Sequence, residues 1–220
     1  MGADEWNGSA LVDLIRPDMG NQLPAVMRVM NTVTALNICL DVVGDLTEDA
    51  GDYVSIAFDT GNDNELTDGA EDQFVFGGDP TLWTHRVYSE AAGDWVVHCP
   101  PYDEVIPDHE DLVWGVGFST SPGSDVDHRI YEISVPLSLI DTVSGSSVGL
   151  ATNGVDSYGV YDASSGLASS WPYFMEKNAS LVNYGDLDLG WQYILTSTIM
   201  SGTAGNSGWF LSEVNISFST

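Results

Sequence analysis

Hydrophobic and polar residues alternate with a period of two along most of the chain. In residues 36–42, Leu, Ile, Leu and Val occupy every second position, which is the pattern of a strand with one buried face. The same pattern predicts further strands at residues 53–58, 73–76, 81–88, 94–99, 112–120, 129–135, 147–152 and 190–196. Clusters of Gly, Asp, Asn, Pro and Ser separate these strands and indicate turns. We therefore expect an all-β protein, an antiparallel β-sandwich of the jelly-roll type.

Two segments depart from this pattern toward helix. Residues 9–15 and 136–140 are each long enough for one short helix. Pro136 begins the second segment at a position where its missing N–H is tolerated, so we expect a single helical turn there.

The end of the chain has a different character. Residues 198–207 are mostly small and predict a linker. Residues 208–218 alternate again, as a strand does. We therefore expect one β-sandwich module over residues 1–197. Over residues 198–220 we expect the linker and either the first strand of a following domain or a final strand of the same sandwich.

The charge of the chain is strongly negative. It has 33 acidic and 5 basic residues, and its formal net charge is -28. This excludes a nucleic-acid-binding protein, which needs a basic surface, and it disfavours docking on anionic lipid. No apolar run is long enough to span a bilayer, so we expect no membrane insertion. An acidic surface suits an extracellular or cell-surface protein exposed to salt or divalent cations.

The densest group of acidic residues lies between two predicted strands, at residues 59–72. Calcium prefers about six to eight oxygen ligands from carboxylates, amides and backbone carbonyls. Gly61 and Gly69 permit the sharp bends that wrap a chain around an ion. The candidate calcium ligands are Asp59, Asn62, Asp63, Asn64, Asp68, Glu71 and Asp72.

We expect calcium in this loop because its acidic side chains have no basic neighbour and repel one another, a repulsion that a dication relieves. In this hypothesis Asp59 and Asp72 bridge the two ends of the loop through the ion. The segment does not match the register of an EF-hand, and the alternative is a solvated acidic hairpin loop. Two other acidic runs, at residues 41–52 and 103–111, are interpreted as solvated loops, and the alternative is that one of them completes a calcium shell from across the sandwich.

The two cysteines leave two alternatives open. Cys39 and Cys99 are compatible with one disulfide in an oxidising compartment, and equally with two buried thiols. Spacing along the chain does not decide between them, because a disulfide requires a specific geometry.

The residues typical of catalysis do not form a motif. The four histidines are scattered, and none has the spacing of a metal-ligand pair. The chain contains neither a Gly-x-Ser-x-Gly nucleophile turn nor a phosphate-binding loop. We therefore expect no enzymatic activity.

The seven tryptophans are spread along the chain. Three of them, Trp83, Trp95 and Trp171, lie beside polar or turn residues, and we interpret them as candidate ligand-contacting residues. Exposed aromatic faces suit the apolar faces of sugar rings. The alternative for each is burial in the core, where tryptophan is found on average.

Several segments, taken in order, resemble carbohydrate-binding module family 9, within the DOMON-like β-sandwich domains. The resemblance extends from residue 4 to about residue 197 and rests on residues 4–9, 27–31, 35–38, 52–59, 128–137, 147–150 and 170–172. It implies a jelly-roll-like sandwich, often with bound calcium, in which some members bind sugars between aromatic side chains. Only the calcium-type loop at residues 59–72 is carried over from the family to this chain.

The last part of the chain resembles a different kind of module. Residues 208–218 are similar to the first strand of immunoglobulin-like repeats found in tandem on prokaryotic surface proteins. This resemblance implies neighbouring domains in a longer chain.

These observations favour a non-catalytic extracellular module, stabilised by calcium, that binds glycan or a cell-surface polymer. The alternative is a structural or adhesive module of a surface layer or filament without a small-molecule ligand. An enzyme of glycan metabolism ranks third, because it requires a deep cleft that holds two carboxylates at glycosidase separation.

Overall fold

The structure is a computed structural model, and it describes residues 6–14, 24–49, 51–99, 111–156, 167–171, 184–190, 198–201 and 215–218. The strands are β1 (Ala10–Leu14), β2 (Ala25–Asn31), β3 (Ala35–Val42), β4 (Tyr53–Asp59), β5 (Asp72–Gly77), β6 (Trp83–Ser89), β7 (Asp94–Cys99), β8 (Val113–Ser121), β9 (Ser124–Pro136), β10 (Ser147–Asp156), β11 (Leu167–Trp171), β12 (Gly185–Asp188), β13 (Thr198–Ser201) and β14 (Asn215–Phe218). A single 3-10 turn, η2 (Leu137–Ile140), follows β9.

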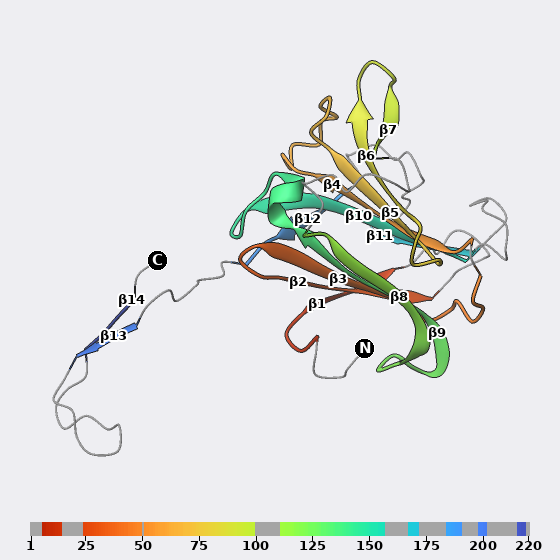
Figure 1. Ribbon diagram of the computed structural model, residues 1–220, viewed down its shortest axis with the longest axis horizontal. Helices are drawn as coiled ribbons and strands as arrows, with labels where there is room; N and C mark the ends of the chain where they lie inside the picture. Colours follow the sequence, from red (N-terminus) through yellow and green to blue (C-terminus); the bar gives the residue numbers. More distant parts are fainter. Residues whose placement is uncertain are drawn as a thin grey trace.

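The strands form two antiparallel sheets that lie in two layers (Figure 1). The five-stranded sheet has the order β1-β2-β3-β9-β8. The seven-stranded sheet has the order β11-β10-β4-β5-β6-β7, and β12 also pairs with β10. The predicted all-β antiparallel sandwich is therefore confirmed.

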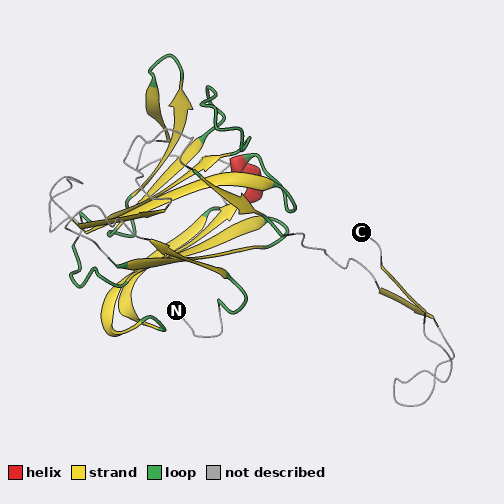
Figure 2. Cartoon of the chain, turned by 180° about the vertical axis from the view of Figure 1, so that it is seen from behind, coloured by secondary structure: helices red, strands yellow, loops and turns green. Residues whose placement is uncertain are grey.

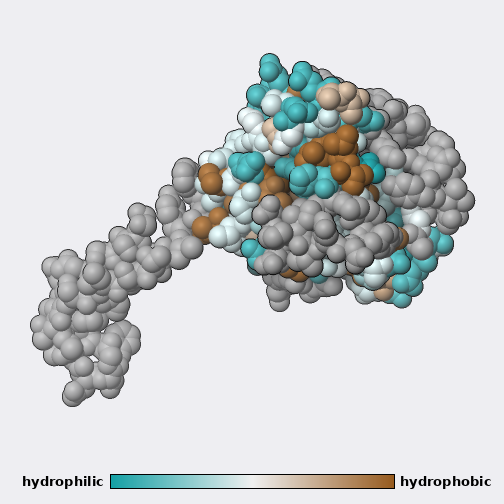
Figure 3. Space-filling view, turned by 45° about the horizontal axis from the view of Figure 1, so that its top comes forward, coloured by the Kyte–Doolittle hydropathy of each residue, from teal (hydrophilic) through white to brown (hydrophobic). Residues whose placement is uncertain are grey.

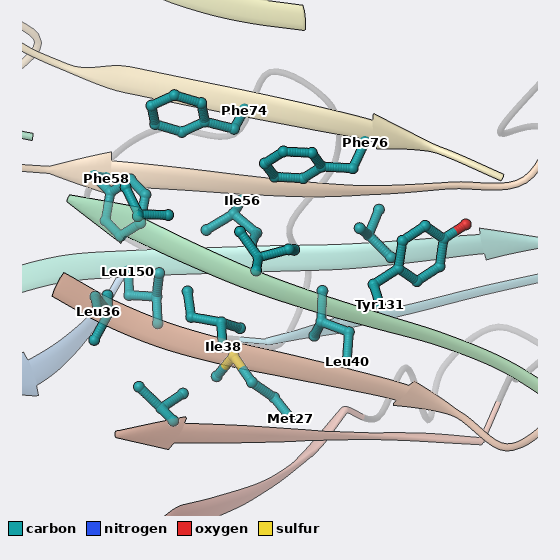
Figure 4. Close-up of a cluster of buried hydrophobic side chains, with 14 of the residues drawn as sticks. Met27, Leu36, Ile38, Leu40, Ile56, Phe58, Phe74, Phe76, Tyr131 and Leu150 are labelled. Atoms are coloured by element: carbon teal, nitrogen blue, oxygen red, sulfur yellow. The ribbon is translucent and has the colours of Figure 1, made fainter. Parts of the chain in front are cut away.

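The inner faces of the two sheets meet in one hydrophobic core, shown in Figure 4. Ile38 of β3 lies opposite Ile133 of β9 in the first sheet, and Ile38 is fully buried. In the second sheet Phe58 and Phe74 pack edge to face, with ring centroids 6.1 Å apart. Burial of an apolar side chain of this size stabilises a fold by about 1.5–3 kcal/mol, so this alternating inner set holds the sandwich together.

The helix predicted over residues 9–15 is wrong, because this segment contains strand β1. Val12 of β1 lies opposite Met27 of β2, and Leu14 is buried. An isolated helix of this length is not stable in water, whereas the edge of β2 offers a ladder of backbone hydrogen bonds. The single turn predicted over residues 136–140 is confirmed by η2, the one helical segment among the described residues (Figure 2).

The later strands agree less completely with the predictions. Strand β2 agrees with the resemblance at residues 27–31, but β11 and β12 were not predicted. β12 has the sequence Gly-Asp-Leu-Asp, which is short and polar, so period alone does not identify it. Of the strand predicted at residues 190–196, only residue 190 is described, and it lies outside any strand.

The last two strands pair with each other in a separate two-stranded sheet. Met200 of β13 lies opposite Ile216 of β14, and this hairpin lies apart from the sandwich in both ribbon views (Figures 1 and 2). β13 occupies residues 198–201, so the first part of the predicted linker is a strand. The strand predicted over residues 208–218 is confirmed at residues 215–218, and the division of the chain near residue 197 stays a prediction.

Cys39 is a free thiol in this structure, so the disulfide alternative is not realised. It is buried beside Trp6 and Ile130 on the side of the five-stranded sheet that faces away from the core. Burial raises the pKa of the Cys39 thiol, and the nearby carboxylates of Glu132 and Asp41 raise it further. The thiol is therefore protonated and chemically inert.

Among the described residues, no helix is long and apolar enough to cross a bilayer.

Candidate functional site

The acid-rich loop predicted to hold calcium connects β4 to β5. Asn62 and Asn64 adopt left-handed backbone conformations, with φ of 48° and 62°, which asparagine tolerates better than most residues. The far side of the loop is tied to the end of β6, because the Gly69 N–H donates to the Tyr88 carbonyl at 2.9 Å. Figure 3 shows hydrophilic residues gathered at the end of the molecule where Figure 1 places the β6–β7 hairpin.

Asp59, the last residue of β4, has an incomplete set of hydrogen bonds. Its side chain is buried, with 1% of the residue exposed. The Oδ2 atom accepts the Asn64 N–H at 3.0 Å, but the buried Oδ1 atom has no partner within the described part of the chain. A buried carboxylate oxygen without a partner costs free energy, so Oδ1 is an acceptor available to a cation.

Two glycines keep the space around this oxygen open. A Cβ placed on Gly61 would lie 3.2 Å from Asp63 Oδ2 and 3.8 Å from Asp59 Oδ1. A Cβ on Gly149, which lies opposite Asp59 in the β4–β10 ladder, would lie 2.8 Å from the Asp59 Cβ and 3.4 Å from Asn62 Oδ1. The oxygens of Asp59, Asn62 and Asp63 are therefore neighbours, and a side chain at either glycine would crowd them.

Glu71 belongs to the same group of carboxylates. It is 2% exposed, and its Oε2 atom accepts the Thr67 N–H at 2.8 Å. Burial raises the pKa of Glu71, and the negative charges of Asp59 and Asp63 raise it further against the opposing effect of the Thr67 hydrogen bond. Burial also raises the pKa of Tyr184, with the charges of Asp59 and Glu71 adding to the effect. The charges of Asp59, Asp63 and Glu71 therefore act on one another or on Tyr184, so these four side chains are electrostatically coupled.

Asn64, another predicted ligand, contacts Asp59 through its backbone N–H, and the side chains of Asp68 and Asp72 have other partners. Asp68 Oδ1 accepts the Glu90 N–H at 2.7 Å, which holds the loop to the turn after β6. Asp72 lies directly opposite Phe58 in the β4–β5 ladder, so its side chain points to the core side of the sheet. There its Oδ1 atom lies 2.7 Å from Nε2 of the buried His85.

The bridge expected between Asp59 and Asp72 is therefore wrong. Successive side chains of a strand point to opposite faces of a sheet. Phe58 belongs to the core, so Asp59 faces outward while Asp72, paired with Phe58, faces inward. The two carboxylates flank the loop in sequence but do not converge in space.

Among the residues that the structure describes, no three or more His, Cys, Asp or Glu side chains form a group that could hold a metal ion. The loop offers the oxygens of Asp59, Asn62, Asp63 and Glu71 as a partial set. Calcium at this loop consequently stays a prediction.

The interpretation of residues 41–52 as a solvated loop is wrong for three of their aspartates. Asp41, Asp45 and Asp52 are each at most 2% exposed. Arg129 of β9 pairs with Asp52 at 2.9 Å and lies 3.8 Å from Asp45. Its guanidinium group also donates to the Asp49 carbonyl at 3.2 Å. This acidic run therefore binds a buried arginine.

Asp41 is bound by His128 of β9 and by Ser121 at the tip of the β8–β9 hairpin. His128 Nε2 lies 2.5 Å from Asp41 Oδ1, and the Ser121 hydroxyl donates to Asp41 Oδ2 at 2.7 Å. The other ring nitrogen of His128 lies 2.7 Å from the Val126 carbonyl. In a chain with so few basic residues, the consecutive pair His128 and Arg129 is the sequence feature from which this network could have been predicted. In the other acidic run, residues 103–111, Asp111 alone is described, and it is exposed.

The three candidate ligand-contacting tryptophans lie on three different strands. Trp83 of β6 and Trp171 of β11 are partly buried and pack against the core, and the Trp171 ring lies directly against Gly185. Strands β6 and β11 are separated by β5, β4 and β10, which places them roughly 19 Å apart at about 4.8 Å per strand. Trp83 and Trp171 therefore do not form a clamp around one sugar ring.

Trp95 lies on the β6–β7 hairpin. It is half-buried and contacts Tyr88 edge to face, with ring centroids 6.2 Å apart. Ligand contact at Trp83, Trp95 or Trp171 stays a prediction.

No protein-family model matches the chain, and no curated protein matches it.

Comparison with solved structures shows a clear likeness of fold. A family 9 carbohydrate-binding module from Caldicellulosiruptor kristjanssonii in complex with glucose is 14% identical, with a TM-score of 0.54, over 90% of this chain and 93% of that chain. The structure of a family 9 module from the same organism with cellotriose is 12% identical, with a TM-score of 0.51, over 90% of this chain and 91% of that chain. A Bacteroides uniformis protein for which carbohydrate binding has been suggested is 12% identical, with a TM-score of 0.51, over 84% of this chain and 88% of that chain.

The resemblance to DOMON-like domains and to surface repeats is not addressed by these structures and stays an expectation. The likeness covers the two-layered arrangement of sheets described above. It identifies the fold of this chain as a β-sandwich of the kind seen in carbohydrate-binding module family 9.

Proposed function

We propose that this chain is a non-catalytic, extracellular carbohydrate-binding module. The observation that carries the proposal is the shared fold, which extends over nine-tenths of the chain and matches family 9 modules in complex with glucose and with cellotriose. The absence of a catalytic motif from the sequence is consistent with binding alone. The acidic composition, with a net charge of -28, favours a secreted protein whose ligand is not an anion.

We further propose that calcium stabilises the module at the loop of residues 59–72. The unpartnered Oδ1 atom of Asp59 supports this proposal, because a buried carboxylate oxygen needs a donor or a cation. Asn62, Asp63 and Glu71 would supply further oxygens, and backbone carbonyls or water the rest of a calcium shell. Asp72 would not take part, because its side chain points to the core side of the sheet beside His85, and Asp68 is instead bound to the turn after β6 through the Glu90 N–H.

Two measurements test the proposal separately. Isothermal titration calorimetry with glucose and cellotriose should show saturable binding to the whole chain. Thermal unfolding of chelator-stripped protein should show a rise in Tm with calcium but not with magnesium, equivalent to about 2.7 kcal/mol at a hundredfold excess of calcium over its Kd.

The two results are independent. Failure to bind any of a panel of neutral glycans would contradict the carbohydrate-binding function and leave a structural module. Equal unfolding with and without calcium would contradict the metal site alone.

A further inference from the structure

A groove of about 440 Å³ crosses the outer face of the five-stranded sheet, on the side away from the core. Strands β3, β9 and β8 supply its floor, and Trp6, which precedes β1, contributes to its wall. The volume lies within the range of about 300–1,000 Å³ that is typical of sites for small ligands. None of the three tryptophans discussed above lines it.

The polar groups of this groove are free to bind a ligand. Asn37 of β3 and Ser134 of β9 lie directly opposite each other, so both side chains point to the same face. Neither side chain has a hydrogen-bond partner among the described residues. Glu132, one row along, lies beside them and accepts the Trp6 Nε1–H with one oxygen at 3.4 Å, which leaves its second oxygen for another donor.

The floor of the groove is smooth along the edge strand. Gly115 of β8 lies opposite Glu132, and a Cβ placed on Gly115 would meet nothing within 4 Å. Val113, two residues before it, is 63% exposed. A glycine flanked by an exposed apolar side chain lets a flat ring approach the backbone closely.

The groove is also nearly neutral in a strongly acidic protein. Residues 112–124, which include all of β8, contain no charged side chain, and Glu132 is the one charged residue in the lining. With a net charge of -28 on the chain, an anionic ligand would be repelled from this face.

We propose that this groove is the glycan-binding site, and that it binds neutral hexose rings of the glucose type. This inference rests on the proposed function and assigns it a place. The apolar face of a sugar ring packs over Gly115 and against Val113 and the Trp6 wall. Its hydroxyl groups exchange hydrogen bonds with the Asn37 amide and the Ser134 hydroxyl, and they donate to the free oxygen of Glu132.

A pair of matched variants tests this assignment by calorimetry with cellotriose. Gly115→Val fills the groove and should weaken binding by at least about tenfold. Gly117→Val changes the same strand on the same face one row farther along, outside the lining, where a Cβ also meets nothing within 4 Å. This control should change the affinity by less than about twofold. Thermal unfolding of both variants should match that of the parent chain.

A second variant avoids any change of backbone. The double substitution Asn37→Ala with Ser134→Ala removes two hydrogen-bonding groups and should also weaken cellotriose binding about tenfold. Replacing cellotriose by an oligouronate of the same length should abolish binding, because each ring then carries a carboxylate.

The outcomes separate this inference from the proposed function. If the parent chain binds cellotriose and the Gly115→Val and double variants bind it equally well, the site lies elsewhere and the groove assignment is overturned, while the carbohydrate-binding function stands. If the oligouronate binds more tightly than cellotriose, the neutral-ligand assignment is overturned. If the parent chain binds none of these sugars, both the inference and the proposed function are overturned.

Discussion

Residues 41–52 and residues 59–72 are two acidic stretches of similar composition with opposite structural roles. In the first stretch, Asp52 and Asp45 are buried against Arg129. In the second stretch, Asp59 is equally buried, but one of its oxygens has no partner among the described residues. The first stretch has a cationic partner, although Arg129 Nε makes no hydrogen bond among the described residues, and the second is a group of carboxylates that a cation would neutralise.

Whether a buried carboxylate has a cationic partner depends here on residues that are distant in the sequence. The partners of the first stretch come from β9, about eighty residues farther along the chain. The β3–β9 ladder brings β9 beside Asp41 and Asp45, with Asp41 opposite Ile130 and Val42 opposite Arg129, and the packing of the two sheets brings Arg129 to Asp52, which precedes β4. Among the described strands, none brings a basic side chain to Asp59, whose neighbour in the β4–β10 ladder is Gly149.

The largest effect is expected from Arg129→Leu. This substitution leaves Asp52 and Asp45 buried without a cation, and breaking a buried pair in this way costs about 3–5 kcal/mol. Urea unfolding measures the loss of unfolding free energy directly. A loss below about 1 kcal/mol would show that the first stretch does not depend on its arginine and would end the contrast with the second.

The second prediction concerns Asp59→Asn. In calcium the variant should lose the stabilisation due to the ion, about 2.7 kcal/mol at a hundredfold excess of calcium over its Kd. In EDTA it should be at least as stable as the parent chain, because the substitution removes a buried charge without a partner. Thermal unfolding under both conditions measures this difference, and an equal loss in calcium and in EDTA would refute a cation at Asp59.

The third prediction concerns pH. The folded-state pKa of Glu71 is raised above its ordinary value of 4.5, first by burial. The folded state therefore binds the Glu71 proton more tightly than the unfolded state does, and stability from this group is lost as the pH rises above 4.5. In EDTA the unfolding free energy should decline over this interval, and Glu71→Gln should make the decline shallower.

Asp72 adds to the same pH dependence. Burial raises its pKa as well, against the opposing effect of His85, so its contribution has the same sign. Asp72→Asn is the matched control, because it removes that second contribution without touching the loop around Asp59. A decline with the same slope in the parent chain and in Glu71→Gln would contradict the shared environment of the loop carboxylates.

The smallest effect is expected from Asp68→Asn. Asp68 is exposed, and its side chain accepts a hydrogen bond from the Glu90 N–H, which an asparagine oxygen can also accept. Unfolding free energy in calcium should change by no more than about 0.5 kcal/mol. A loss as large as that of Asp59→Asn would place Asp68 among the ligands and enlarge the proposed calcium shell.

The amount that sequence could predict differs between the fold and the site. Alternation in segments such as residues 36–42 identified most core strands, because one buried face imposes a period of two. Alternation could not identify β12, because this strand is only four residues long. For the acidic loop, the residue types indicated calcium, but the direction of Asp72 depended on its pairing with Phe58.

The sequence by itself determined the all-β class, the strongly negative charge and the location of the acid-rich loop, since these follow from local pattern and composition. The tertiary structure alone decided which acids are neutralised, because Arg129 of the five-stranded sheet reaches Asp52, just before β4 of the seven-stranded sheet, only when the two sheets pack together. It also decided that Asn37, Ser134 and Gly115 share one groove, because register between β3, β9 and β8 places them there. Contacts between residues distant in sequence depend on strand order and register, and a single sequence carries no local signal for either.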